Sequence, residues 1–484
     1  MKSFVSDTTF YTLINIFLKS ISLISFSLLT KNFSVPEYGT INTIFYLSQL
    51  IIIIIIFGQD SSLARYLHHY KENSDKKVLI SESLCFQLLL YLLFIIPLSM
   101  VFRYAINFSP ELQSIKSIFN IILIQLPFSI IISFSLNVFK WTFSRFKFLI
   151  ISLSNTILYI FSLAIGIKYF NISIQGVFII SLSINIIIAF ISIFLIKNMI
   201  VRPSKFLYIK KLISYGVPYG LICIITAILP LIERSLILYR FNLYELGLFS
   251  AGYTLAVLVD SLGYGFQSAW QPNAFALYDK DNSQTLFNTI AKLFSITMCM
   301  TVLLLCGISH IMISFIASEN FKLSTLFIFP IAIGFSIQHL SWIFGIGIKL
   351  TRRSKLEFYS YLIYLLSTII GIWYFSGKFN LYGICIGILF GQIIKLFIMS
   401  YFANTVYPKN WPFLSIAYIY IVTLLIGFIN SSLYYKPEFP VSLSYILGAF
   451  FVFIFGWFVL FRYEERKNII IFLWDIKNKI FLQK

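Results

Sequence analysis

The chain carries little charge, and most of that charge has one sign. Charged residues make up 11% of its 484 residues, with 18 acidic and 37 basic side chains. Apolar residues make up 59%, which leaves too few polar groups to cover a soluble globule of this length. The composition therefore predicts an integral membrane protein.

Several motifs are also missing. The sequence has no phosphate-binding P-loop and no long polar loop, which argues against an ATP-driven pump and against an enzyme with a large catalytic segment outside the membrane. The five cysteines all lie in apolar runs, and their number and spacing indicate neither disulfides nor a metal site. We therefore expect no metal and no cofactor.

Long apolar runs dominate what is present. A transmembrane helix needs about 20 apolar residues, so the runs predict an all-α integral membrane fold with about 14 transmembrane helices (12–14). A β-barrel is excluded, because its strands would alternate apolar and polar residues. The predicted spans are approximately 10–29, 41–57, 82–102, 118–139, 148–169, 175–196, 214–238, 246–270, 291–316, 324–349, 356–375, 381–402, 413–432 and 441–461.

Lysine and arginine are distributed unevenly among the loops. With the N-terminus in the cytoplasm, most of them fall on the cytoplasmic side, including those of the tail from Arg462. The positive-inside rule then predicts a multi-pass protein of the bacterial cytoplasmic (inner) membrane with both termini in the cytoplasm. We interpret the net charge of +19 as this orientation signal and as anchoring to membrane lipids, not as nucleic-acid binding.

Two segments six spans apart resemble each other. "PEYGTINTIFYLSQL" opens the second span and "YELGLFSAGYTLAVL" opens the eighth. The aligned pairs are Glu37 with Glu245, Gly39 with Gly247, and Gln59 with Gln267. A repeat across six helices returns the chain to the same side, which predicts two six-helix lobes related by a parallel pseudo-two-fold axis. The predicted division is an N-lobe 1–204, a C-lobe 205–405, and two C-terminal helices with a basic cytoplasmic tail in 406–484.

Together with the residues that flank them, these two segments resemble the two signature regions of the polysaccharide-biosynthesis flippases of the Wzx or O-antigen type. This type belongs to the MOP superfamily, which also contains MATE exporters. The first region has a Pro-Glu-x-Gly turn, a Gly-containing turn and an Arg-Tyr, and the second has a Gly-x-Pro helix start, an acidic-Arg pair and a Glu-x-Gly turn. The matching residues are Pro36, Glu37, Gly39, Gly58, Arg65, Tyr66, Gly216, Pro218, Glu233, Arg234, Glu245 and Gly247. Relatives often have Asp at the position of Glu233, and they commonly have twelve spans.

The resemblance implies a flippase, not an enzyme. Its substrate would be an undecaprenyl-diphosphate-linked oligosaccharide, such as an O-antigen repeat unit, moved from the cytoplasmic to the periplasmic leaflet by alternating access coupled to an ion or the membrane potential. A polysaccharide polymerase and a chain-length regulator are further expected partners. Two alternatives stay open: a MATE-like cation-coupled exporter of small amphipathic compounds, and a membrane polysaccharide polymerase, which the short loops disfavour.

Moving sugars and a diphosphate past hydrocarbon requires polar and positively charged groups along the path. Thr12, Asn15, Lys19 and Ser22 share one face of the first span. Lys19, near mid-span, is the candidate contact for the diphosphate, and a structural ion pair is the alternative. The other candidate cavity residues are Asn42, Tyr46 and Gln49 on the second span, and Asp260, Tyr264, His339 and Lys395 in the second half.

Asp260 or His339 is also a candidate for ion coupling, although a buried Asp with a Lys partner can instead hold the lobes together. A second set of residues lies at span ends, where a gate or a lobe-closing ion pair competes with helix termination and lipid anchoring. This set consists of Gln59, Asp60, Arg65, Glu233, Arg234 and Gln267. On the fourth span, Gln125, Ser129 and Ser133 form a stripe that indicates either a lining face or close helix packing.

Overall fold

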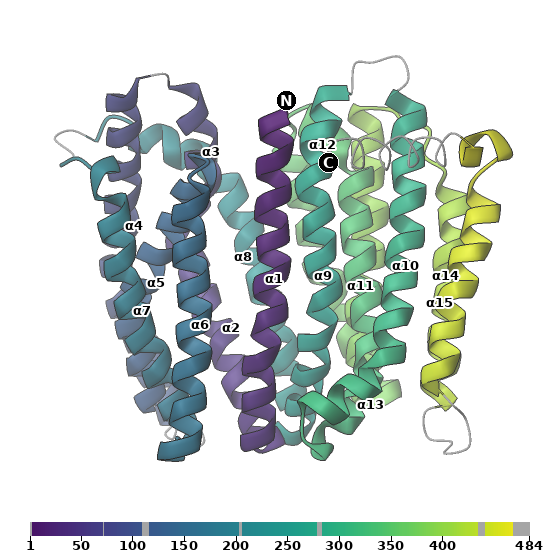
Figure 1. The fold of residues 1–484 in the computed structure, drawn as a ribbon, viewed down its shortest axis with the longest axis horizontal. Helices are drawn as coiled ribbons and strands as arrows, with labels where there is room; N and C mark the ends of the chain where they lie inside the picture. Colours follow the sequence, from purple (N-terminus) through teal and green to yellow (C-terminus); the bar gives the residue numbers. More distant parts are fainter. Residues whose placement is uncertain are drawn as a thin grey trace, which may run out of the picture. The chain divides into compact units, whose positions relative to one another are not determined.

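The computed structural model describes residues 2–70, 72–108, 116–202, 206–277, 283–433 and 441–467. These residues form helices joined by short connections, and no strand occurs among them (Figure 1). The chain divides into two compact units. Unit 1 is Met1–Ala251, Ile316–Asn320 and Arg353–Ile369, and unit 2 is Gly252–Phe315, Phe321–Arg352 and Ile370–Lys484. The lobe boundary near residue 204 stays a prediction.

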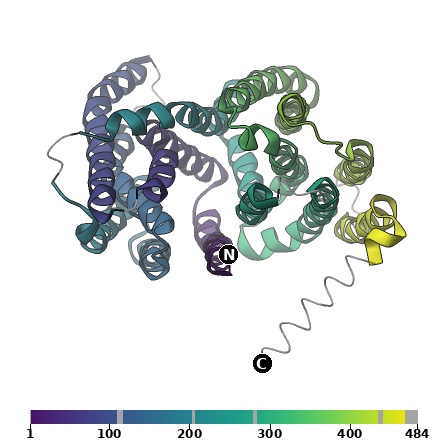
Figure 2. The same cartoon turned by 90° about the horizontal axis from the view of Figure 1, so that it is seen from above.

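Unit 1 holds the N-terminal helices, whose ends are seen from above in Figure 2. They are α1 (Lys2–Asn32), α2 (Val35–Ile56), α3 (Gln59–His69), α4 (Asn73–Phe108), α5 (Lys116–Trp141), α6 (Arg145–Phe170), α7 (Ile174–Ile196), the 3-10 turn η2 (Lys197–Met199) and α8 (Ile209–Arg240). Within this unit α5 packs along α7, and α2 and α3 both pack on α8.

Most of the remaining helices lie in unit 2, although α9, η3 and α13 begin in unit 1. They are α9 (Leu243–Leu277), α10 (Ser283–Ile316), η3 (Glu319–Ser324), α11 (Thr325–Phe344), α12 (Ile346–Leu350), α13 (Ser354–Val406), α14 (Phe413–Leu433) and α15 (Val441–Leu460). Buried side chains are most frequent on the stretch from Glu319 to Phe344, where 89% of an 18-residue segment is buried.

The prediction of an all-helical membrane fold is confirmed. In the part of the chain that is described, 12 helices are long and apolar enough to cross a membrane. They overlap the predicted second to fourteenth spans, and α13 contains two of these. The first predicted span lies within α1. Helices suit these runs because a helix satisfies its own backbone hydrogen bonds, which hydrocarbon cannot do.

Helix α13 contains 53 residues and is broken in the middle. Phe379 (φ −123°, ψ 19°) and Asn380 (φ 51°, ψ −139°) are not helical, so the arms 354–378 and 381–406 correspond to the predicted eleventh and twelfth spans. Near the break the arms approach closely: a Cβ added to Gly371 would lie 3.0 Å from the carbonyl oxygen of Gly387.

The two repeated segments bring their glycines together in unit 1. Gly39 lies in the first turns of α2 and Gly247 in the first turns of α9. A Cβ added to Gly39 would lie 2.8 Å from the backbone nitrogen of Gly247. The absence of both side chains therefore lets the starts of these two helices touch through their backbones.

A second close contact lies where α2 gives way to α3. Phe57 and Gly58 both have left-handed backbones, with φ of 45° and 71°, so the chain turns sharply and α3 starts at once. A Cβ on Gly58 would meet the carbonyl oxygen of Gly216 and the nitrogen of Gly220 on α8. The Ser62 hydroxyl donates to the Leu212 carbonyl at 2.7 Å. This glycine contact fixes α3 against the first half of α8.

We predict that Gly58→Ala destabilises the protein, because alanine disfavours the left-handed backbone and its methyl group overlaps α8. The expected loss in the free energy of unfolding is about 2 to 5 kcal/mol. Thermal unfolding of the purified protein in detergent measures it. The control is Gly334→Ala, since a Cβ there meets only the Gln392 side chain at 3.8 Å. Equal melting temperatures for the two variants would contradict the prediction.

Candidate functional site

An arginine is completely buried in unit 1. Arg234 on α8 is 0% exposed, and its guanidinium donates to Asn42 Oδ1 on α2, from Nη2 at 2.8 Å and from Nε at 3.3 Å. The guanidinium carbon lies 3.9 Å from the centre of the Tyr46 ring. Two predicted cavity residues and one predicted gate residue therefore meet, and we call Asn42, Tyr46 and Arg234 the arginine cluster.

The local sequence of α8 suits this cluster. Pro230 lies one turn before Arg234, and its carbonyl oxygen accepts a hydrogen bond from Arg234 Nη1 at 2.9 Å. A buried charge is costly unless it is partnered, and stacking on an aromatic face is worth about 2 kcal/mol when water is excluded. The cluster thus holds a positive charge within a membrane-spanning helix.

Glu233 precedes Arg234 but points elsewhere, because adjacent helical residues do not face one another. Its side chain is 3% exposed, and its Oε2 has no hydrogen-bond partner within the described residues. Glu233 therefore contributes a second buried polar group on α8, separate from the stacking contact.

Unit 2 contains a buried histidine beside a carboxylate. His339 on α11 is 2% exposed, and its Nε2 lies 2.9 Å from Asp260 Oδ1 on α9. We call these two residues the histidine pair. The ring centres of Tyr264 and Trp342 lie 5.2 Å and 4.5 Å from that of His339. In the described part of the chain, Nδ1 of His339 has no hydrogen-bond partner.

Glycine makes room for the histidine pair. Gly263 faces His339 across the contact between α9 and α11, and a Cβ at residue 263 would overlap the imidazole ring. Any side chain at this position would therefore push the ring away from Asp260.

Lys395 lies in the same unit, on the second arm of α13, and is 0% exposed. One turn earlier on that arm, Gln392 Nε2 donates to Gln338 Oε1 on α11 at 2.9 Å. The two helices are thus joined by a polar contact next to the histidine pair and Lys395.

The remaining predicted gate residues lie around α3, with the exception of Gln267, which is half-buried on α9. Gln59 is buried and accepts a hydrogen bond from Ser83 at 2.9 Å, while Arg65 is exposed and stacks on Tyr215 at 4.4 Å. Burial raises the pKa of the Asp60 carboxyl, and backbone hydrogen bonds and the charge of Lys140 oppose that rise.

The predicted lining of α1 is not gathered into either cluster. Lys19 is exposed, and the Ser22 hydroxyl donates to the Lys19 carbonyl at 2.6 Å. Gln49 on α2 is also exposed. The side chains of Thr12 and Asn15 lie outside the described ones.

The stripe on the fourth predicted span serves helix packing. Gln125 Nε2 on α5 donates to Ser181 on α7 at 3.1 Å, and Asn185 on α7 donates to Ser129 at 3.1 Å. Of the two interpretations of this stripe, the contacts favour close packing.

Sequence reasoning missed Glu82 on α4. Its carboxylate is 0% exposed and accepts backbone N–H groups of Leu207 and Tyr208, each at 2.7 Å. A lone acidic residue at the start of an apolar run was the available signal. Its effect is to fix the chain just before α8 against α4.

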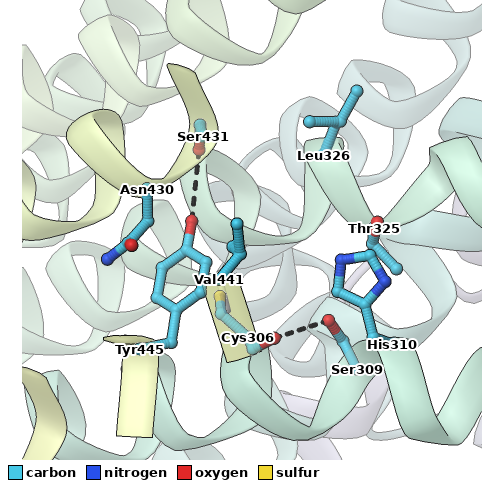
Figure 3. Close-up of a pocket in the computed structure, with 9 residues that line it drawn as sticks. All are labelled: Cys306, Ser309, His310, Thr325, Leu326, Asn430, Ser431, Val441 and Tyr445. Atoms are coloured by element: carbon cyan, nitrogen blue, oxygen red, sulfur yellow. Dashed lines mark hydrogen bonds between the residues drawn. The ribbon is translucent and has the colours of Figure 1, made fainter. Parts of the chain in front are cut away.

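A small polar pocket lies among α10, α11, α14 and α15 of unit 2 (Figure 3). The Tyr445 hydroxyl is within 3.2 Å of Ser431, and Ser309 donates to the Cys306 carbonyl at 2.7 Å. His310 lines the opposite side. Over the described residues, no group of three His, Cys, Asp or Glu side chains is placed to hold a metal ion.

Long apolar helices with a few buried ionisable side chains define a multi-pass helical membrane protein, and solved structures identify its fold. The lipid II flippase MurJ, in an inward closed conformation, is 16% identical, with a TM-score of 0.70 over 94% of this chain and 98% of that one. An inward-facing multidrug resistance MATE family transporter of the MOP superfamily is 11% identical, with a TM-score of 0.65 over 81% and 97%. The chain therefore shares its fold with these two solved structures.

A family model described as "Polysaccharide biosynthesis protein" matches residues 4–277, which is more than half of the chain. The protein belongs to this family. Comparison with curated proteins gives no match.

We predict that Tyr46→Leu destabilises the protein more than Tyr46→Phe does, because phenylalanine keeps the aromatic face under the Arg234 guanidinium. The expected difference in the free energy of unfolding is about 1 to 2 kcal/mol. Thermal unfolding of both variants at equal detergent concentration measures it. A phenylalanine variant as unstable as the leucine variant would show that the stacking contact does not stabilise the buried charge.

We predict that Gly263→Ala is destabilising in the natural protein but tolerated when His339 is also alanine, because the added methyl group then enters the space of the missing ring. The expected coupling between the two substitutions is about 1 to 3 kcal/mol. The four proteins of this double-mutant cycle are compared by thermal unfolding. Additive effects would rule out the close contact.

Proposed function

We propose that the protein is a flippase for an undecaprenyl-diphosphate-linked oligosaccharide, such as the repeat unit of O antigen or a related surface polysaccharide. The family match over residues 4–277 carries the proposal. The substrate moves from the cytoplasmic to the periplasmic leaflet of the bacterial inner membrane, and both termini lie in the cytoplasm. No chemical bond is made or broken.

Buried and membrane-located cations support this substrate class. A diphosphate is strongly anionic, and a path through hydrocarbon must offset that charge. Lys19 on α1 supplies an exposed ammonium, and Arg234 supplies a guanidinium fixed by Asn42 and Tyr46. In this proposal Lys19 contacts the diphosphate, and the arginine cluster keeps a positive field inside unit 1.

The histidine pair supplies the coupling step of the proposal. His339 Nε2 lies 2.9 Å from the Asp260 carboxylate, and histidine is the side chain whose charge changes most readily near neutral pH. Such a pair lets proton binding bias one state of unit 2, which is the requirement for ion-coupled alternating access. A polysaccharide polymerase and a chain-length regulator receive and extend the flipped unit.

A MATE-like exporter of small amphipathic compounds is the second candidate, and the shared fold with a multidrug MATE transporter favours it. Deletion of the gene in its own host separates the two. The proposal expects loss of surface polysaccharide with repeat units trapped on the cytoplasmic side. Unchanged polysaccharide with altered sensitivity to drugs would support the exporter instead.

We predict that Lys19→Ala lowers transport of lipid-linked glycan in inverted membrane vesicles about tenfold or more, the value of one charge-assisted contact. Lys19→Arg keeps the charge and retains part of the rate. The matched control is Lys31→Ala, which removes an exposed lysine from the last turn of the same helix. Normal transport by Lys19→Ala at equal expression would exclude Lys19 as the diphosphate contact.

A further inference from the structure

Five tyrosines form a line of ring contacts in unit 1, on α3 and the start of α8. Neighbouring ring centres are 4.9 Å apart for Tyr208 and Tyr70, 6.5 Å for Tyr70 and Tyr66, 6.1 Å for Tyr66 and Tyr215, and 5.3 Å for Tyr215 and Tyr219. We call these residues the tyrosine row. Tyr66 lies on α3 and Tyr70 directly follows that helix, while Tyr208 directly precedes α8. Tyr215 and Tyr219 are four residues apart on α8, which places their rings on one face of that helix.

Two exposed cations border the tyrosine row. The Arg65 guanidinium carbon lies 4.4 Å from the ring centre of Tyr215 and 6.0 Å from that of Tyr66. Lys211 lies one turn before Tyr215 on α8, and its Nζ is 3.2 Å from the Tyr70 hydroxyl. The surface therefore combines flat aromatic faces with two positive charges.

Buried groups hold this surface in place. The fully buried Glu82 accepts the backbone N–H groups of Leu207 and Tyr208, and the Tyr208 hydroxyl donates to Asp75 at 2.9 Å. The glycine contact between Gly58 and α8 fixes α3 from the other side. The rings and cations are thus positioned before any ligand arrives, which lowers the ordering cost of binding.

The tyrosine row differs from an ordinary interfacial belt of aromatic residues. Belt residues anchor a helix by placing single rings at the head-group level, whereas these rings contact one another in series and carry cations on their faces. Aromatic faces bind apolar ring surfaces, and arginine binds phosphate oxygens through paired N–H groups. A sugar joined to a diphosphate presents both surfaces side by side.

We propose that the tyrosine row, with Arg65 and Lys211, is the entry site for the glycosyl-diphosphate head group of the substrate. The sugar rings stack on Tyr215 and Tyr66, and the diphosphate pairs with Arg65 and Lys211. The inference rests on the proposed function and on the orientation that places this end of α3 and α8 in the cytoplasm.

Two soluble probes test the site on the purified full-length protein: a short-chain prenyl diphosphate bearing a disaccharide, and the same prenyl diphosphate without sugar. Tyr215→Leu is expected to weaken binding of the sugar-bearing probe about tenfold and to leave the sugar-free probe unchanged. Arg65→Ala is expected to weaken both probes about tenfold or more, and Arg65→Lys to restore part of the affinity.

Matched controls come from α6. Lys168 lies 5.2 Å from the ring centre of Tyr169, which reproduces a cation on a tyrosine at another helix end of the same unit. Tyr169→Leu and Lys168→Ala should bind both probes as the natural protein does. Tyr66→Leu serves as a second sugar-contact variant if Tyr215→Leu fails to fold, as judged by its melting temperature.

Three results overturn the entry site. The first is that the variants of the tyrosine row bind both probes as the natural protein does, and the second is that Tyr215→Leu weakens binding of both probes equally. The third is that the variants change only the stabilisation that phosphatidylglycerol vesicles give the protein. The last result identifies the surface as a lipid anchor. If the natural protein binds neither probe and transports no lipid-linked glycan, the proposed function itself fails, so the two failures are distinguishable.

Discussion

Hydrocarbon cannot donate or accept hydrogen bonds, and this constraint organises the main buried polar contacts of the membrane-spanning helices. Arg234 reaches Asn42 and the face of Tyr46, His339 reaches Asp260, and Glu82 takes two backbone N–H groups. In the first two cases one helix supplies a polar group that another helix needs, and in the third a helix supplies the acceptor for the segment just before α8. The polar contacts therefore determine which helices are neighbours. The apolar surface requires only that the helices bury it, whichever helix provides the cover.

These partnerships depend on how closely backbones approach. Gly263 leaves space for the imidazole of His339, and Gly58 lets α3 lie directly on α8. Where bulky side chains separate helices, polar tips cannot meet at hydrogen-bond distance. The polar contacts thus depend on the glycine contacts. The glycine contacts bring together residues that are far apart in the sequence, and in this way they position the charges that the proposed transport requires.

The helices were predictable from the sequence because apolar runs of sufficient length have few other structures in a membrane, and Arg234, Asp260 and His339 stood out as ionisable groups inside such runs. Their partners were not predictable. Asn42 and Arg234 lie on separate helices, and their contact depends on packing geometry that periodicity does not encode. Glu82 escaped notice because it lies at the edge of a run, where a carboxylate normally faces water. The polar stripe of α5 was ambiguous until its contacts with α7 were known.

The break in α13 bears on how the protein enters the membrane. Only Phe379 and Asn380 separate two arms that each have the length of a span, and the arms touch at Gly371 and Gly387. A loop of two residues is too short to carry the basic residues that set the orientation of a helix. Lys378 is its single basic neighbour. The two arms must therefore insert together as one hairpin, so that the direction of the second follows from that of the first and not from flanking charges.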